Sequence, residues 1–389
     1  MKRSPWQLII LTAVAAGFAD MAYEGMRGIA GAYLGLLGAS ATAVGVAAGA
    51  GELAGYTLRL ASGWLGDRTR AYWTLTLVGY GINLVAIPGL ALTGSWEAAV
   101  ALVVLERIGK GLRAPARSTL VSHAAVEVGP GVSFGFDELI DQMGAISGPL
   151  LVGLAMWLHG GGDLERHRFA FVLLGVPVIA NLAVLLVARA RYPRPDEMWR
   201  QPEGPPDPHV GRRFWIYMIA AGLMGAGLAD WALIAFHFQG QGLVGPELLA
   251  VVYAGAMAVD AIAALVFGLL FDRRGLTVLI LSTALCAGAA PLVFLSGDLN
   301  LALAGAALWG VGMGAQESVF KAAIAKLVPA DRRGRAYGLF YGVFGVSWFA
   351  GSALMGVLYD RSLVALALFS VCAQLAAIPP LLALTRRRA

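Results

Sequence analysis

Long apolar runs alternate with short polar segments along the whole chain, a pattern that predicts helices crossing a membrane. A helix needs about 20 mostly apolar residues to span roughly 30 Å of hydrocarbon. Runs of this length lie near residues 6–37, 41–65, 72–93, 97–124, 131–158, 167–188, 214–239, 246–271, 275–296, 298–327, 334–359 and 362–385. The pattern therefore predicts an all-α membrane protein with twelve transmembrane helices.

The predicted helices form two sets of six. Residues 189–213 separate the sets and contain six prolines and ten charged residues, a composition typical of a solvated linker. We therefore expect an N-terminal bundle at 1–188, a cytoplasmic linker, and a C-terminal bundle at 214–389.

Lysine and arginine are distributed unevenly among the predicted loops. Under twelve spans most of them fall on one side, and the opposite loops hold only Arg166, Arg168 and Arg361. Cytoplasmic loops carry an excess of basic residues. The distribution predicts a protein of the cytoplasmic (inner) membrane with both termini in the cytoplasm.

Composition supports the membrane assignment and excludes other classes. The chain is 58% hydrophobic and 14% charged, whereas soluble domains are roughly a quarter charged. The net charge of +5 resides mainly in short loops, which argues against a nucleic-acid partner. The G-x-S-x-G pattern at 131–135 lacks the strand that a nucleophile elbow needs, and Cys286 and Cys372 have no metal-ligand spacing. We expect neither an enzyme nor a bound cofactor or metal.

The two sets of helices repeat each other. GFAD at 17–20 recurs as GLAD at 227–230, and GWLGDR at 63–68 recurs as GLLFDR at 268–273. Paired glycines follow in the same order, namely Gly109 and Gly111 with Gly312 and Gly314, and Gly135 and Gly148 with Gly338 and Gly351. Two pseudo-symmetric six-helix bundles with a site between them are typical of an alternating-access carrier.

Charged residues inside the first predicted span need an explanation. Asp20, Glu24 and Arg27 lie on one helix face, and one unpaired charge at the bilayer centre costs about 2.5–3.5 kcal/mol. The three side chains must therefore face the protein interior, where they pair or line water. On the fifth span, Asp137 and Asp141 share a stripe with two glycines, and Glu138 lies about 100° around the helix.

These acids are candidate proton carriers. Burial raises the pKa of a carboxyl group in general and a nearby arginine lowers it, so a carboxylate under both influences is able to bind and release a proton. We expect proton coupling at Asp20, Glu24, Asp137 and Asp141, with Glu138 beside them. The alternative is a static ion-pair network that holds the first bundle together.

The remaining intramembrane polar and aromatic residues are candidates for a substrate cavity. The charges concentrate in the first half, whereas aromatic side chains dominate the second and predict a stacking surface. The candidates are Arg27, Glu106, Arg107, Lys110, Arg113, Asp230, Tyr253, His237, Asp260, Glu317, Lys321, Tyr341, Phe344 and Trp348.

Two motifs make the chain resemble the major facilitator superfamily over essentially its whole length. Gly63, Asp67 and Arg68 match the superfamily's signature between helices two and three, although Arg70 stands where a later glycine is expected. The second-half copy keeps Gly268, Asp272 and Arg273. The resemblance implies that these residues control the cytoplasmic gate.

The fifth span adds a second motif. Gly135, Gly144, Gly148 and Pro149 resemble the antiporter signature of that superfamily, with one extra residue before the last glycine. The layout also resembles poorly characterised prokaryotic members described as sugar-transport-like. Together these resemblances imply the major facilitator fold and favour export in exchange for protons.

We therefore expect a monomeric, proton-coupled secondary transporter that exports a small organic molecule by alternating access, surrounded by membrane lipids. Three alternatives remain open: a divalent-cation transporter, which oxygen ligands would suit, a symporter for an anionic or sugar-like solute, and a lipid flippase or non-transporting sensor. The sequence does not identify the substrate.

Overall fold

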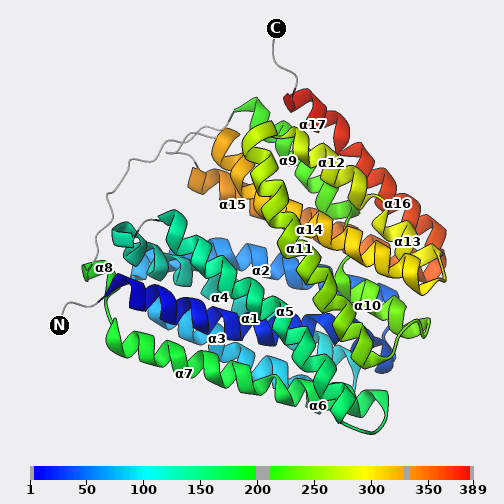
Figure 1. The fold of residues 1–389 in the computed structure, drawn as a ribbon, viewed down its shortest axis with the longest axis horizontal. Helices are drawn as coiled ribbons and strands as arrows, with labels where there is room; N and C mark the ends of the chain where they lie inside the picture. Colours follow the sequence, from blue (N-terminus) through cyan, green and yellow to red (C-terminus); the bar gives the residue numbers. More distant parts are fainter. Residues whose placement is uncertain (1–3, 129, 199–210, 328–332, 386–389) are drawn as a thin grey trace. The chain divides into compact units, whose positions relative to one another are not determined.

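A computed structural model of the chain describes residues 4–128, 130–198, 211–327 and 333–385, and within these ranges the regular structure is helical, without strands (Figure 1). Contacts between residues divide the chain into two compact units. Unit 1 comprises Met1–Leu37, Ala54–Glu203 and Pro246–Ala254. Unit 2 comprises Gly38–Leu53, Gly204–Gly245 and Gly255–Ala389.

The first half of the chain supplies the helices around the N-terminal helix α1, which packs against α5 and α7, while α3 packs along α4. Apolar side chains of α1, α3, α4 and α7 form a core that includes Leu8, Trp73, Leu120 and Leu185. The bounds are α1 (Pro5–Leu36), α2 (Ala41–Thr69), α3 (Tyr72–Gly89), η1 (Leu90–Leu92), α4 (Trp96–Val128), α5 (Pro130–Leu158), α6 (Asp163–Leu173), α7 (Gly175–Arg191) and α8 (Pro195–Met198).

The second half repeats this arrangement around α9, which packs against α15, α16 and α17, while α14 packs against α12 and α13. The bounds are α9 (Arg212–Gly227), α10 (Trp231–Gly240), α11 (Pro246–Arg274), α12 (Thr277–Cys286), α13 (Ala289–Leu295), α14 (Leu299–Leu327), α15 (Arg333–Arg361), α16 (Leu363–Ala376) and α17 (Ile378–Thr385).

The expected all-α membrane fold is confirmed. Within the described ranges, nine helices or consecutive helix pairs are long and apolar enough to cross a membrane. Three more, α2, α4 and α14, have 29, 33 and 29 residues and are long enough to span, but they are more polar. With these three, every predicted span has a helical counterpart near its expected position.

Breaks inside several spans were not predicted. One span is divided into α6 and α7 at Leu174, another into α12 and α13 at 287–288, and a third into α16 and α17 at Ala377. The interruption between α9 and α10 is the largest, since Leu228 and Asp230 adopt extended backbone conformations.

The glycine repeat corresponds to repeated helix packing. A Cβ atom added to Gly111 would overlap Gly55 of α2, and one added to Gly314 would overlap Asp260 of α11. Equivalent glycines therefore occupy equivalent close helix contacts in the two halves. Close approach of the backbones leaves no room for a larger side chain at these positions.

The two compact units do not coincide with the N-terminal and C-terminal halves of the sequence, and they differ from them in two segments. Residues 38–53 group with unit 2, where Gly45 and Gly49 of α2 pack against the α15 backbone at Ser352 and Phe349. Residues 246–254 of α11 group with unit 1. Close glycine packing on α15 accounts for the first exchange.

Candidate functional site

Close packing of α1 on α5 positions the acidic residues of both helices. A Cβ atom on Gly144 would overlap Gly17, and one on Gly148 would overlap the carbonyl group of Met21. Because both α5 glycines contact α1 directly, the α1 segment that contains Asp20 is held against α5.

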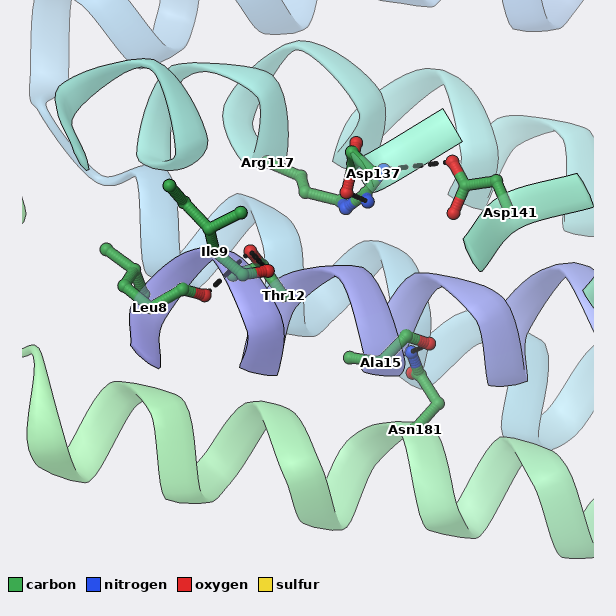
Figure 2. Close-up of polar contacts among 8 residues, drawn as sticks. All are labelled: Leu8, Ile9, Thr12, Ala15, Arg117, Asp137, Asp141 and Asn181. Atoms are coloured by element: carbon green, nitrogen blue, oxygen red, sulfur yellow. Dashed lines mark hydrogen bonds and ion pairs between the residues drawn. The ribbon is translucent and has the colours of Figure 1, made fainter. Parts of the chain in front are cut away.

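Polar contacts fix the other side of α1 as well. The side-chain amide of Asn181 on α7 donates a hydrogen bond to the carbonyl oxygen of Ala15 (Figure 2). One turn earlier, the Thr12 hydroxyl donates to the carbonyl oxygen of Leu8 at 2.9 Å, so this buried hydroxyl is satisfied within its own helix. α1 is thus held by α7 at Ala15 and by α5 at Gly17 and Met21.

Arg117 of α4 binds two carboxylates of α5. Its guanidinium group forms an ion pair with Asp137 and lies 3.6 Å from a carboxylate oxygen of Asp141 (Figure 2). Both acids lie on the same side of α5 because four residues separate them, about one turn. Arg117 is not among the site residues predicted from the sequence, yet it links α4 to α5.

Glu138 does not join this cluster. Its side chain is exposed, and its contact is with Gln142 at 3.4 Å on the same helix. The acids of the fifth span therefore separate into the pair Asp137 and Asp141, which is buried or half-buried, and the exposed Glu138.

A second cluster connects α4 with α3. The guanidinium group of Arg113 lies 3.6 Å from Glu106, donates to the Asn83 side chain at 3.3 Å, and stands over the ring of Tyr80 at 4.6 Å. Glu106 and Arg113 are 1% and 3% exposed. Their pairing keeps two buried charges compensated, as a low-dielectric environment requires.

The third cluster surrounds Tyr23 of α1. The Lys110 ammonium lies 3.7 Å from the centre of the Tyr23 ring, and the Arg107 guanidinium lies 4.6 Å from it. Both distances are those of a cation–π interaction. Two cations of α4 therefore approach the α1 face that carries the acids.

Asp20 differs from every other acid of this region. It is half-buried, and among the described side chains none lies within ion-pair distance of its carboxylate. Lys110 attracts Asp20 more strongly than any other cation does, and Glu24 repels it. Asp20 is thus an intramembrane carboxylate among charged groups, without a direct bond to any described side chain.

Glu24 has two direct partners. Arg27 lies 3.6 Å away on the same helix, and the Tyr253 hydroxyl of α11 donates a hydrogen bond to the Glu24 carboxylate. A Cβ atom on Gly28 would lie 2.7 Å from the Tyr253 ring, so this glycine makes room for it. Tyr253 belongs to unit 1 together with α1.

In unit 2, Asp230 occupies a different environment from its repeat partner Asp20. One carboxylate oxygen accepts the backbone N–H of Ala232 at 3.0 Å and so caps α10, and the other accepts the indole N–H of Trp348 at 3.2 Å. Asp230 therefore stabilises the start of α10 and contacts α15.

Side chains satisfy the carbonyl groups that the break between α9 and α10 leaves open. The Trp309 indole donates to Ala229 at 2.8 Å, and the Ser370 hydroxyl donates to Gly227 at 2.6 Å. Backbone groups at membrane depth need such partners because no bulk water reaches them.

The predicted aromatic surface is largely internal packing. Phe344 stacks on Phe340 and contacts Trp348, with ring centres 5.4 Å apart in each pair, and all three side chains are at most 5% exposed. Tyr341 packs against Phe340. These rings form a core between α9, α14 and α15 in unit 2.

The other predicted site residues fall outside these clusters. His237 is buried and hydrogen-bonded to the Tyr359 hydroxyl at 2.8 Å, Asp260 is buried on α11, and Glu317 is exposed. Pro149 is buried on α5. The side chains of Asp67, Asp272 and Lys321, and the surroundings of Gly135, lie outside what the structure describes.

The predicted gating motifs occupy matching positions in the two halves. Gly63 faces Pro115 of α4, and Gly268 faces Ser318 of α14. Arg68 is exposed beside Trp64, and Arg273 is exposed in the last turn of α11.

Comparison with known proteins identifies the family. The family model described as Major Facilitator Superfamily matches residues 9–352 and again residues 233–389. The chain belongs to the major facilitator superfamily. Its fold and family make it a transporter of small molecules rather than an enzyme, and an integral membrane protein.

Relatives and solved structures agree with this membership. An uncharacterized protein of Mycobacterium tuberculosis is 36% identical over 381 residues, which cover 96% of this chain and 92% of that protein. The crystal structure of a nucleoside transporter, NupG, superimposes with a TM-score of 0.77 at 12% identity, covering 96% of this chain and 99% of the other. A POT family transporter in complex with 5-aminolevulinic acid gives 0.76 at 14% identity, covering 96% and 94%. At these identities the structures establish the fold of this superfamily member and leave its substrate open.

Proposed function

We propose that this superfamily member is a proton-coupled transporter in which Asp20 is the principal proton-binding group. The observation that carries the proposal is the isolation of Asp20. The other acids predicted to carry protons on α1 and α5 have direct partners, or, in the case of Glu138, an exposed position.

Isolation matters because a coupling carboxyl group must exist in both protonation states. The cation of a close ion pair stabilises the carboxylate only while the carboxylate is ionised. Protonating that carboxylate therefore loses the whole interaction energy of the ion pair. Asp20 has Lys110 as its strongest attractive influence and Glu24 as an opposing one, without a bonded partner among the described side chains. A change in either neighbour is then enough to alter its proton occupancy.

In this proposal Asp20 works together with three other acids. They relay protons to and from Asp20 and set the electrostatic environment of its carboxylate: Glu24, Asp137 and Asp141. The Arg117 pair holds α4 against α5, and the Tyr253 bond holds α11 against α1. Movement of these helices during alternating access changes the charges that Asp20 experiences. The helix-five glycine motif favours antiport and hence export from the cytoplasm, with both termini on the cytoplasmic side of the inner membrane.

Infrared difference spectroscopy tests proton binding without knowledge of the substrate. Protonation of a carboxylate creates a C=O stretching band. We expect this band in the difference spectrum of the wild-type protein recorded between two pH values. Asp20→Asn removes this band if Asp20 is the group that binds the proton. Glu138→Gln is the matched control, because it removes an exposed acid from the neighbouring helix. An unchanged band in Asp20→Asn contradicts the assignment.

A transport assay requires a known ligand. A thermal-shift screen of the purified protein against drugs, sugars, organic anions and metals is designed to identify one. In proteoliposomes, external ligand that exchanges for internal protons makes the lumen alkaline. Asp20→Asn is expected to abolish this pH change while preserving ligand binding.

An anion symporter is a second candidate function, favoured by Lys110. Its ammonium lies against the Tyr23 ring and makes no ion pair among the described side chains, so it is available to an anionic solute. In that case external ligand and protons enter together, and the lumen becomes acidic. The sign of the pH change separates the two functions.

A further inference from the structure

A cavity of about 400 Å³ lies at one end of unit 1, apart from the charged clusters described above. Its lining includes Arg70 after α2, His123 of α4, Arg189 in the last turn of α7, and Arg194 with Glu197 around α8. None of these side chains takes part in the Asp20, Glu24 or Arg117 contacts.

The lining carries an excess of positive charge. Arg194 pairs with Glu197 at 3.1 Å, which compensates one arginine. Arg70 and Arg189 make no ion pair with any described side chain. Among the described side chains, these two guanidinium groups thus border the cavity without an ion-pair partner.

His123 lies in the same wall, with its ring beside that of Tyr72 at a centre-to-centre distance of 6.2 Å. Both of its ring nitrogens are shielded from solvent, and neither has a hydrogen-bond partner among the described residues. Because the shielded nitrogens do not face the cavity, the imidazole contributes shape to the lining and not a hydrogen-bonding group.

The first turn of α3 completes the lining. Ala71, the residue before α3, and the next three residues border the cavity, and within the described chain no side chain caps this helix start. The backbone N–H groups of a first helical turn have no partner inside the helix and, with the helix dipole, attract anions. An alanine at this position has no side-chain acceptor to offer them.

We propose that this cavity is a binding site for a phosphate group, distinct from the transport site. Arginine forks and a helix N-terminus are the protein groups that recognise phosphate. The site is held in place, because the Trp73 indole donates to the Tyr192 carbonyl oxygen at 2.9 Å and the Tyr192 hydroxyl donates to Ser4 at 2.9 Å. The cavity exceeds what a small inorganic anion fills and has room for a phosphorylated headgroup.

On the orientation proposed above, the cavity opens on the cytoplasmic side, next to the inner leaflet. The phosphate then belongs either to an anionic lipid headgroup or to a soluble phosphate compound of the cytoplasm. Basic pockets between helices on this side of a membrane suit anionic headgroups. This inference does not depend on proton coupling, so failure of the Asp20 test leaves it intact.

Binding to the purified full-length protein in detergent tests the proposal. The probes are dihexanoyl phosphatidylglycerol, dihexanoyl phosphatidylcholine and inorganic pyrophosphate, measured by calorimetry and by the shift in Tm. Arg189→Gln is the test variant and Arg191→Gln the matched control, since Arg191 is exposed in the same last turn of α7 and does not line the cavity. Both changes affect exposed side chains, and gel filtration checks that the fold persists.

We expect phosphatidylglycerol to bind more tightly than phosphatidylcholine, and Arg189→Gln to weaken phosphatidylglycerol at least about tenfold while Arg191→Gln leaves it unchanged. Binding of pyrophosphate with the same dependence on Arg189 supports the site and assigns it to soluble phosphate compounds. Equal effects of the two variants, or no binding of either anionic probe, overturns the proposal.

Discussion

Tyr253 of α11 donates its hydroxyl hydrogen to the carboxylate of Glu24 on α1, across a sequence separation of 229 residues. Tyr253 is fully buried and Glu24 is 9% exposed. Arg27 lies 3.6 Å from the same carboxylate. The bond therefore links the two repeats of the chain within unit 1, at a buried charge that has one cation and one neutral donor.

Removing the Tyr253 hydroxyl tests how much its hydrogen bond to Glu24 contributes to the stability of the protein. Tyr253→Phe leaves the ring in place and takes away the hydroxyl, so we expect a loss of about 1.5–3 kcal/mol, the usual worth of a hydrogen bond to a charged group. Thermal unfolding in detergent measures the change. The structural reason is that the Glu24 carboxylate keeps Arg27 but loses a donor that water does not replace at this depth.

Tyr33→Phe is the matched control for that variant. The Tyr33 hydroxyl is also buried but donates to a neutral acceptor, the Leu90 carbonyl oxygen, at 2.8 Å. We expect a smaller loss of about 0.5–1.5 kcal/mol. If both variants lower Tm equally, the Tyr253 bond is not one to an ionised carboxylate.

Arg117 is predicted to be needed for stability because it compensates two acids at once. Arg117→Gln leaves Asp137 and Asp141 without their cation, and breaking a buried pair costs about 3–5 kcal/mol. Replacing one acid as well, in Arg117→Gln with Asp137→Asn, removes one of the uncompensated charges and should restore part of the loss. Chemical unfolding of the two variants measures the difference. A double variant less stable than the single one contradicts this interpretation.

The sequence predicted the helices well because apolar length alone determines a membrane span. It also predicted that charges on these spans face the protein interior, since the cost of exposing them to lipid is large. Glu24, Glu106 and Asp137 are buried as expected, whereas Glu138 of α5 is exposed. Their partners were not predictable. Tyr253 meets Glu24 only through tertiary packing. Periodicity along α5 did set Glu138 about 100° away from Asp137 and Asp141, but it could not show which of the two faces would be exposed.

The glycine repeat was visible in the sequence, and its structural role leads to a prediction on α15. A Cβ atom at Gly351 would overlap the Ala226 backbone of α9, whereas one at Gly342 meets no atom within 4 Å. We expect Gly351→Ala to separate α9 from α15 and to lower Tm strongly. Gly342→Ala should leave Tm unchanged or raise it, because alanine in a helix is favoured over glycine by roughly 0.5–1 kcal/mol. Similar Tm values for the two variants would mean that the helices repack without cost.

Asp20 and Asp230 occupy the same position in the repeated motif, yet the helix around Asp20 is continuous and the one before Asp230 is broken. The sequence could not distinguish them, because the break depends on distant donors such as Trp309 and Ser370. Asp230 caps α10 through Ala232, whereas Asp20 has no bonded partner among the described side chains. The geometry therefore predicts a structural role for Asp230 and a coupling role for Asp20.

Parallel substitutions separate the two roles. Asp230→Asn keeps an oxygen acceptor for the cap and should preserve most of the stability and the proton-coupled transport. Asp230→Ala loses the cap and leaves the Trp348 indole without its acceptor, so we expect a loss of about 1–3 kcal/mol in unfolding measurements. Asp20→Asn should show the reverse pattern, with Tm near that of the wild type and no ligand-driven pH change in proteoliposomes. If Asp230→Asn abolishes the pH change and Asp20→Asn does not, the proton carrier belongs to the second repeat.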